Sequence, residues 1–281
     1  MSPSFDLHTH STASDGTLTP TELVERAAAG GVGALALTDH DTLEGLAEAV
    51  AAARTAGIEL VPGVEISVTW EGGTVHLVGL NVDTGCESLQ AGLARLREFR
   101  DWRAREIGRR LARDAGIADA FDGARALSNG RLVSRTHFAR YLVAQGRAES
   151  VRDVFNKFLK QGKPGHVAGQ WAGLAEAVTW IRAAGGQAVL AHPARYPLTR
   201  TRLRRLLGEF RDAGGAGLEV VSGSHSRDDV FHMAQQARAH GLLASAGSDY
   251  HGPEQPWIEL GRLPDLPPGC RPIWAEWAVA A

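Results

Sequence analysis

Short apolar runs alternate along this chain with longer Ala- and Leu-rich stretches. The apolar runs predict seven strands, at 4–7, 34–38, 59–64, 74–80, 187–191, 217–221 and 243–246. The stretches between them predict helices, at 22–29, 43–56, 174–184, 200–213 and 227–240. Several of these stretches end at a glycine, which is typical of a helix C-terminus. Strands that alternate with helices indicate a mainly parallel sheet, and seven of them are enough to close an α/β barrel.

The segment 98–164 breaks this alternation. Its apolar residues recur at helical spacing, and it contains no convincing strand. We therefore expect a helical insertion at 98–164, between the fourth and fifth strands, and a barrel built from 1–97 and 165–281. A length of 281 residues would suit two domains, but an α/β barrel of this size can also be one domain.

Composition excludes several classes of protein. Apolar residues at 44% and charged residues at 22% are those of an ordinary globular chain, not of a disordered, collagenous or coiled-coil one. No run of 18 apolar residues predicts a membrane span, and the first residues do not resemble a secretory signal. Two cysteines suit a reducing compartment, so we expect a cytoplasmic protein. The net charge of −2 argues against a general nucleic-acid coat, and no obligate protein partner is evident.

Histidine is abundant, at 11 residues, and many histidines and carboxylates fall at the ends of predicted strands. In α/β barrels the catalytic residues lie at the carboxyl ends of the strands. Nine candidate metal ligands follow this rule: His8, His10, Asp15, His40, Glu65, His76, His192, Asp249 and His251. Imidazole and carboxylate ligands without thiolate suit Mn²⁺, Fe²⁺ or Zn²⁺, with Mg²⁺ a further choice. Nine ligands are too many for one ion, whereas three ions would use them.

Spacing supports this interpretation. His8 and His10 lie two residues apart, and alternation along an extended chain turns both imidazoles to the same side. Taken singly, the candidates have simpler explanations: His76 as a hydrogen-bonded core residue, Asp15 as a turn residue. Asp39 could cap a helix or accept a hydrogen bond from the neighbouring His40. Nine such groups together favour metal binding, because unpaired polar groups are costly to bury.

Five motifs carry a resemblance to a known family. They are D-L-H-T-H-S-x-x-S-D-G at 6–16, L-A-L-T-D-H-D-T at 35–42, P-G-V-E-I-S at 62–67, A-H-P at 191–193 and G-S-D-Y-H at 247–251. In this order they resemble the PHP (polymerase and histidinol phosphatase) family, over nearly the whole chain. The context of Asp15 is most similar to the TrpH-like branch, described as 3′,5′-nucleotide bisphosphate phosphatases or 5′→3′ exoribonucleases. The resemblance implies a distorted seven-stranded (β/α) barrel.

The resemblance also implies how the ligands are shared among three ions, most often Mn²⁺. His8, His10, Glu65 and Asp249 would hold the first ion. Glu65, His76 and His192 would hold the second, and Asp15, His40 and His251 the third. Many members have His where this chain has Asp15, so the third site departs from the commonest pattern.

These ligands predict a phosphoesterase. A water bridging two divalent ions loses a proton readily and attacks phosphorus in line, while the metals neutralise charge on the phosphoryl group. We take Asp15, Glu65, His192 and Asp249 as the central catalytic residues. The expected reaction removes a terminal phosphate from a 3′,5′-bisphosphonucleotide, such as 3′-phosphoadenosine 5′-phosphate, or from a short oligoribonucleotide.

The insertion is expected to supply the substrate contacts. Ser134, Arg135 and His137 lie near a predicted helix start, where a bidentate Arg and free backbone N–H groups can bind a second phosphate. Lys163 and His166 could serve similarly. Arg135 could instead be a surface residue, and the arginine-rich stretch 95–113 is interleaved with acids, which favours a solvated, ion-paired face over an RNA track.

Five further residues are weaker candidates. Tyr250 and Arg195 adjoin ligand loops and could contact substrate. His225, His232 and His240 are interpreted as structural or exposed.

Other functions keep parts of this pattern. A histidinol-phosphate phosphatase would use the same metals on a substrate with one phosphate, which would leave the Arg135 site unexplained. An amidohydrolase would normally have a bridging Lys where this chain offers Glu65. A non-catalytic, polymerase-accessory PHP domain would not need a complete ligand set.

Overall fold

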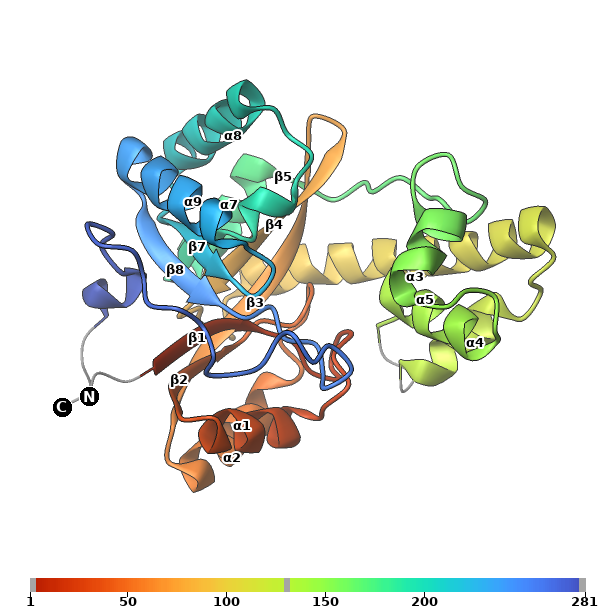
Figure 1. The fold of residues 1–281 in the computed structure, drawn as a ribbon, viewed down its shortest axis with the longest axis horizontal. Helices are drawn as coiled ribbons and strands as arrows, with labels where there is room; N and C mark the ends of the chain where they lie inside the picture. Colours follow the sequence, from red (N-terminus) through yellow and green to blue (C-terminus); the bar gives the residue numbers. More distant parts are fainter. Residues whose placement is uncertain (1–3, 129–131, 278–281) are drawn as a thin grey trace.

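Seven strands of the computed structural model, which describes residues 4–128 and 132–277, form a nearly closed barrel (Figure 1). They run in the order β1-β2-β3-β4-β6-β7-β8. Their bounds are β1 Ser4–Thr9, β2 Val32–Leu37, β3 Glu59–Trp70, β4 Gly73–Leu80, β6 Gln187–Leu190, β7 Gly217–Ser222 and β8 Leu243–Gly247. All seven coincide with predicted strands, and the distorted (β/α) barrel is confirmed.

Among the described residues, backbone hydrogen bonds close the barrel between β1 and β8 at one end. The Asp249 backbone N–H donates to the His8 carbonyl at 2.8 Å, and the His10 N–H donates to the Tyr250 carbonyl at 3.0 Å. These bonds lie just beyond the carboxyl end of β8, at the mouth of the barrel. The backbone bonds that close the barrel therefore also fix candidate ligands.

Strand β4 runs antiparallel to both neighbours, β3 and β6, whereas the other pairs on this path are parallel. The predicted third strand stopped at 64, but β3 continues to Trp70 and turns back through Glu71 and Gly72. Both turn residues have positive φ, 46° and 75°, as a two-residue type I′ hairpin turn requires. Because β4 is reversed, its first half lies at the mouth, and His76 faces that end although it is not at a strand terminus.

Five helices cover the outside of the barrel (Figure 1). They are α1 Pro20–Ala29, α2 Leu46–Ala56, α7 Leu174–Ala183, α8 Arg200–Asp212 and α9 Arg227–His240. All five were predicted, although α2 starts three residues later than expected. A short strand, β5 Ala172–Gly173, adds to the edge of β3, and short 3₁₀ turns occur at Pro193–Arg195 and Ile273–Glu276. The described residues beyond Gly252, 253–277, otherwise have little regular structure.

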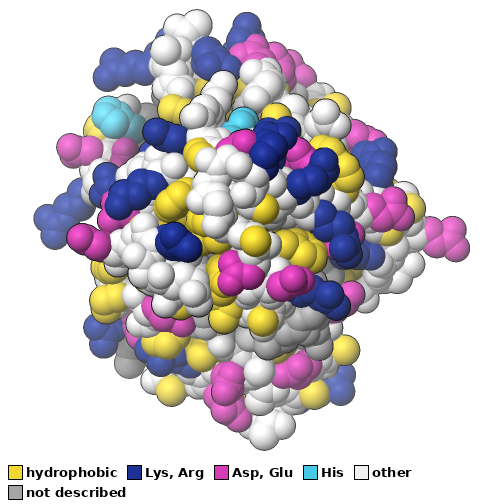
Figure 2. Space-filling view, turned by 90° about the vertical axis from the view of Figure 1, so that its right-hand side faces the viewer, with side chains coloured by type: hydrophobic (Ala, Val, Ile, Leu, Met, Phe, Trp, Pro, Cys, Tyr) yellow, Lys and Arg dark blue, Asp and Glu magenta, His cyan; other side chains and the backbone are white. Residues whose placement is uncertain are grey.

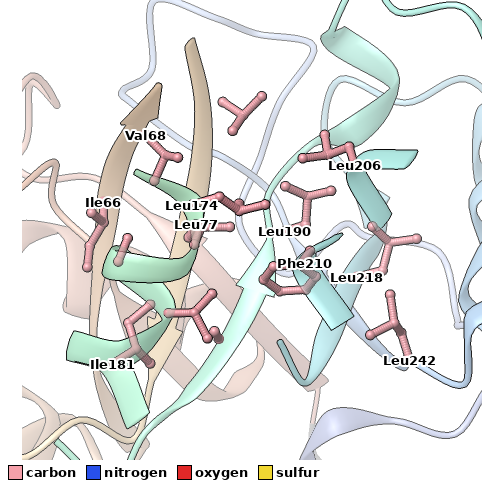
Figure 3. Close-up of a cluster of buried hydrophobic side chains, with 14 of the residues drawn as sticks. Ile66, Val68, Leu77, Leu174, Ile181, Leu190, Leu206, Phe210, Leu218 and Leu242 are labelled. Atoms are coloured by element: carbon pink, nitrogen blue, oxygen red, sulfur yellow. The ribbon is translucent and has the colours of Figure 1, made fainter. Parts of the chain in front are cut away.

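The main core fills the space between sheet and helices (Figure 3). Strand residues such as Ile66, Leu77 and Leu190 pack against Ile181 of α7 and Phe210 of α8, and all five are fully buried. Burial of each such side chain contributes about 1.5–3 kcal/mol. This packing makes the barrel wall a rigid support for the side chains at its mouth.

The segment between β4 and β5 is helical and has a core of its own. It contains α3 Glu87–Ala115, α4 Ala120–Leu127, α5 Arg135–Ala144, α6 Val151–Val154 and a π-helical turn at Phe155–Leu159. Helix α3 is shared, because Leu93 and Leu96 pack in the barrel core while Ile107 and Leu111 pack in the second core. The change from one core to the other falls between Leu96 and Ala104. Within the described residues, no helix, α3 included, is long and apolar enough to cross a membrane.

Candidate metal centre

Six imidazoles meet at the mouth of the barrel. They belong to His8, His10, His40, His76, His192 and His251, the histidines predicted as ligands. Neighbouring ring centroids are 4.2 to 6.3 Å apart. The rings come from β1, β4 and the segments that follow β1, β2, β6 and β8, so the fold brings together residues that are far apart in the sequence.

Glu65 lies at the centre of these rings. Its Oε1 is 2.8 Å from His76 Nδ1 and 3.0 Å from His192 Nε2. Its Oε2 is 2.8 Å from His40 Nδ1 and 3.3 Å from His10 Nε2. A carboxylate whose two oxygens face different imidazoles is suited to bridge two cations.

Two more carboxylates flank the cluster. Asp249 Oδ1 lies 3.5 Å from His8 Nε2 and 3.3 Å from His10 Nε2. Asp15 Oδ1 lies 3.3 Å from His251 Nε2. Asp249 and His192 adopt positive φ values, 56° and 28°, which non-glycine residues rarely do. Such backbone conformations concentrate at functional sites, where the surrounding structure enforces them.

The donor atoms fit divalent cations. Several buried atoms of the cluster have no hydrogen-bond partner, among them His8 Nε2, both ring nitrogens of His10, Asp15 Oδ1 and Glu65 Oε2. Buried polar atoms are nearly always paired, so a group of unpaired ones pointing at one space indicates a missing ligand. Nitrogen and oxygen donors without sulfur suit first-row divalent metals.

Four sets of side chains place donor atoms within 4.8 Å of one another. They are His10-Asp15-His40-His251, His8-His10-Asp249, His8-Glu65-His192 and His40-Glu65-His76. All nine predicted ligands belong to at least one set. The sets overlap more than the predicted division does, because His10 also faces the Asp15 set and His40 also faces Glu65.

Electrostatics keep the central carboxylate and two of the six imidazoles in the form that binds metal, whereas neighbouring carboxylates raise the pKa of His8, His40 and His251. Burial alone would raise the pKa of Glu65, but the neighbouring imidazoles, His40 first, hold it well below its ordinary value. Burial lowers the pKa of His10 to about 3, with the charge of His251 adding to the effect. Burial likewise lowers the pKa of His76 to about 4. Ionised carboxylates beside neutral imidazoles are the forms that bind metal.

A cavity of about 210 Å³ opens over the cluster. Its far wall is formed by the arginines Arg100, Arg103 and Arg135 and by the aromatic rings of Phe155 and Trp171. Arg100 and Arg103 stack over Trp171 at 5.0 and 5.2 Å, and Arg135 stacks over Phe155 at 5.5 Å. The cavity therefore has a cation-binding floor and a cationic wall.

The placement of Arg100 and Arg103 corrects the interpretation of 95–113 as a solvated face. The outer side of α3 does carry surface ion pairs, such as Arg105–Asp101 and Arg113–Asp114, and basic and acidic groups are interleaved on this side of the molecule (Figure 2). Arg100 and Arg103 instead turn inward and are each 8% exposed. Their spacing of three residues, one helical turn, was the available signal.

Arg100 and Arg103 are held in place by different partners. Arg100 donates to Asp41 Oδ2 at 2.6 Å and to Ser67 Oγ at 2.7 Å. Arg103 donates to the Val167 carbonyl at 3.0 and 2.8 Å. Burial, and then the charges of Arg135 and Arg100, lower the pKa of Arg103 to about 9, so it remains charged at neutral pH.

The predicted substrate residues at 134–137 lie at the start of α5. Ser134 and Arg135 line the cavity. Ser134 is the helix cap, and its hydroxyl also donates to Asp15 Oδ2 at 3.1 Å. His137 is buried, is not among the lining residues, and its Nδ1 accepts from the Ser134 N–H at 3.0 Å. Ser134 therefore connects the helical segment to a candidate ligand.

Other candidates fall in varied places. Lys163 is exposed and His166 half-buried, and neither lines the cavity. Arg195 lines it and donates to Asp249, whereas Tyr250 is fully buried in a hydrophobic cluster behind α1. Asp39 accepts hydrogen bonds from Ser11 and Ser14, so the expected bond to His40 is wrong. His225, His232 and His240 do not line the cavity.

A barrel mouth that gathers imidazoles and carboxylates beside a cationic wall defines a metal-dependent hydrolase of anionic esters. The PHP domain matches residues 6–168, and the chain belongs to the PHP family. It is 54% identical over 273 residues to the 3′,5′-nucleoside bisphosphate phosphatase of Chromobacterium violaceum, covering 97% of this chain and 95% of that one. It is 46% identical over 275 residues to the 5′-3′ exoribonuclease Rnm of Escherichia coli, covering 97% and 93%.

Two solved structures share this fold. A Chromobacterium violaceum amidohydrolase with bound sulfate and no metal superimposes with a TM-score of 0.93 at 54% identity, covering 97% of this chain and 95% of that one. A Bifidobacterium adolescentis protein assigned as a metal-dependent phosphoesterase gives 0.83 at 30% identity, covering 93% and 92%. The chain is therefore a phosphoesterase of the PHP family with a divalent-metal centre.

Proposed function

We propose that this protein removes a terminal phosphate from 3′,5′-bisphosphonucleotides. The observation that carries the proposal is the cavity with two anion-attracting sides, the cluster around Glu65 and the wall formed by Arg100, Arg103 and Arg135. A substrate with two phosphates can place one on each side. The 3′,5′-nucleoside bisphosphate phosphatase activity of the Chromobacterium violaceum relative supports the same class of substrate.

The arginine wall needs an anion. Of its three guanidinium groups, only that of Arg100 forms an ion pair with a carboxylate in the described part of the chain, to Asp41. Buried like charges without counter-ions are unfavourable. A phosphate dianion would supply the missing charge and accept bidentate bonds from Arg103 and Arg135.

The nine residues of the cluster would hold the metals, for which we propose three ions and Mn²⁺ as the first choice. When bound, such ions activate water and neutralise charge on the transferring phosphoryl group. Glu65 orients the ligand imidazoles around it through contacts at 2.8 to 3.4 Å. Arg195, at the cavity edge, donates to Asp249 Oδ2 and fixes the free oxygen Oδ1 toward His8 and His10.

The helical segment would act as a roof over the barrel mouth, with 98–164 as the unit that selects substrate. Ser134 and Arg135 contribute directly to the cavity. His137 supports them by fixing the first turn of α5. Lys163 and His166 would meet parts of a substrate that extend beyond the cavity, because they lie outside its lining.

A second candidate activity is removal of nucleotides from the 5′ end of short RNA. The E. coli relative named as a 5′-3′ exoribonuclease favours it. In that reaction the arginine wall would bind the terminal phosphate while the scissile ester lies on the metals. Histidinol phosphate has one phosphate and leaves the wall unpaired, so it is the weaker choice.

Phosphate release from Mn²⁺-loaded protein tests these proposals. The substrates are 3′,5′-bisphosphoadenosine, 5′-AMP, 3′-AMP, histidinol phosphate and a short 5′-phosphorylated RNA with product analysis by chromatography. We expect kcat/KM to be highest for the bisphosphate. Equal rates for the monophosphates would contradict a two-phosphate site, and no release from any nucleotide by metal-bound protein would overturn the proposed function.

A further inference from the structure

Glu219 is a buried carboxylate that the mechanism above does not use. It lies in β7, within the sequence G-L-E-V-V-S, and is 2% exposed. An ionised carboxylate in such a place is unfavourable unless its oxygens are well paired. Glu219 belongs to none of the four candidate ligand sets.

Both oxygens of Glu219 face parts of the metal centre. Oε1 lies 3.0 Å from His8 Nδ1, and Oε2 accepts from the His192 backbone N–H at 2.5 Å. His8 comes from β1, and His192 lies two residues after Leu190, the last residue of β6. One side chain therefore connects two ligands that are 184 residues apart in the sequence, 192 minus 8.

Position 247 leaves room for this contact. Gly247 is in β8, the strand between β7 and β1. A Cβ atom there would lie 2.3 Å from His8 Cβ and 2.8 Å from Glu219 Oε1. The missing side chain lets Glu219 reach across β8 to His8.

The contact fixes which nitrogen of His8 faces the metals. A carboxylate at Nδ1 favours the tautomer with hydrogen on Nδ1, and it leaves the Nε2 lone pair free. His8 Nε2 has no hydrogen-bond partner and lies 3.4 Å from Glu65 Oε1 and 3.5 Å from Asp249 Oδ1. This is the geometry of a ligand imidazole whose other N–H is held by an acceptor.

The second oxygen acts on the backbone of His192. This residue has φ 28°, a conformation that needs support from its surroundings. The bond from its N–H to Glu219 supplies that support and keeps the imidazole Nε2 at 3.0 Å from Glu65 Oε1.

We propose that Glu219 is a positioning residue that orients His8 and His192 together and touches neither metal nor substrate. The proposal rests on the metal centre of the proposed function. It predicts that His8 carries a proton on Nδ1, the nitrogen that faces the Glu219 carboxylate. It also predicts that loss of the Glu219 carboxylate weakens metal binding at two ligands at once.

The first test needs no change at Glu219. Long-range ¹⁵N–¹H NMR of the metal-free wild-type protein reports the tautomer of each imidazole, with His8 assigned by the loss of its signals in His8→Gln. We expect a proton on Nδ1 of His8. A neutral ring that carries its proton on Nε2 alone would overturn the proposal.

The second test uses Glu219→Gln, with Glu59→Gln as control because Glu59 is exposed at the start of β3. Glutamine keeps the shape but has one acceptor oxygen, so its NH₂ must face one of the two N–H donors. In a folded variant we expect Mn²⁺ affinity, measured by competition with a chelator, to fall about 10- to 100-fold, and the His8 tautomer to become mixed. The control should bind Mn²⁺ like the wild type.

Two results would overturn this role. Unchanged affinity with an unchanged tautomer would make Glu219 a simple core residue. Loss of one whole ion, with unchanged affinity for the others and an unchanged tautomer, would make it a ligand. If the wild type binds Mn²⁺ but releases no phosphate from any nucleotide, the proposed function fails while these tests still decide the role of Glu219.

Discussion

Arg103 shows how a single residue can set substrate choice. Its guanidinium is nearly buried, is bonded to a backbone carbonyl and faces the cavity beside Arg135. Neither contact neutralises its charge. An anion that binds beside Arg103 would neutralise this buried charge. We therefore expect Arg103 to strengthen binding of the second phosphate.

We predict that Arg103→Ala raises KM for a 3′,5′-bisphosphonucleotide roughly 10- to 100-fold, the range for one lost hydrogen bond to a charged group. KM for an aryl phosphate, which has one phosphate, should change little. Steady-state kinetics with both substrates measures the difference. Arg105→Ala is the matched control, because Arg105 is exposed and paired with Asp101 on the outer side of the same helix. Equal losses on both substrates would refute the role.

The residue scale also shows what the sequence can and cannot reveal. The His8-x-His10 spacing predicted two rings on one side, and the structure confirms it, because strand alternation is a local property. Arg103 was missed because its neighbours alternate in charge, and only tertiary packing turns it inward. Glu219 was missed because one acid in an apolar strand has no spacing pattern that points to a distant histidine.

At the scale of elements, the start of α5 meets the Asp15 loop. The Ser134 hydroxyl donates to Asp15 Oδ2, and Arg140 donates to the Asp15 carbonyl at 2.8 Å. Asp15 Oδ1 is left without a partner and points to His251. The helical segment therefore shapes one end of the metal cluster as well as covering it.

We predict that Ser134→Gly lowers the Mn²⁺ affinity of the Asp15 set about 10-fold, as expected for loss of a bond to a ligand carboxylate. Glycine is a tolerable helix cap, so stability should fall by only a few tenths of a kcal/mol. Manganese titration followed by electron paramagnetic resonance measures the affinity. Ser226→Gly makes the same change at the cap of α9 and should have no effect on metal. Wild-type titration curves for Ser134→Gly would show that Asp15 is held without Ser134.

The first turn of α5 also predicts that the stability of the protein depends on pH. Burial, and then the charge of Arg140, lower the pKa of His137 to about 4. Its folded pKa lies below the unfolded value near 6.5, so the unfolded chain binds the extra proton. The stability from neutral His137 is fully present above about pH 6.5 and is lost as pH falls toward 4.

Between pH 7.5 and 5.5 this loss amounts to roughly 1 kcal/mol of unfolding free energy. We predict that metal-free wild type loses that much more stability over this range than His137→Gln. Glutamine can accept the same Ser134 N–H bond without titrating. Denaturant melts of both proteins at the two pH values measure the difference, and identical pH profiles would show that His137 does not contribute.

The sequence predicted the order of the helices and strands more completely than the direction in which each strand runs. Helix α9 begins and ends where its pattern predicts, because Ser226 and Gly241 mark both ends. The reversal of β4 was not predicted, since it depends on the two-residue turn at Glu71 and Gly72. The reversal places His76 at the mouth of the barrel. The sequence identified His76 as a candidate ligand but could not explain how it reaches the site.

At the scale of the whole molecule, stability and metal binding are linked at the barrel mouth. Three carboxylates and six imidazoles occupy this site, and several of their buried atoms have no partner. The hydrophobic cores of the barrel and of the helical segment, both of which include residues of α3, supply no polar partner for those atoms. Cations that bind the folded chain should therefore stabilise it by mass action.

We predict that a chelator lowers the melting temperature and that excess Mn²⁺ restores it. A free concentration 100-fold above Kd stabilises by about 2.7 kcal/mol per site, or several degrees for a chain of this size. The effect should be larger at pH 8 than at pH 6, because ligand imidazoles must be deprotonated to bind. Glu65→Gln removes the carboxylate that faces five imidazoles, so its melting temperature should respond to Mn²⁺ much less than that of Glu59→Gln. Scanning calorimetry measures all three proteins, and an equal response in Glu65→Gln would place the stabilising ions outside this centre.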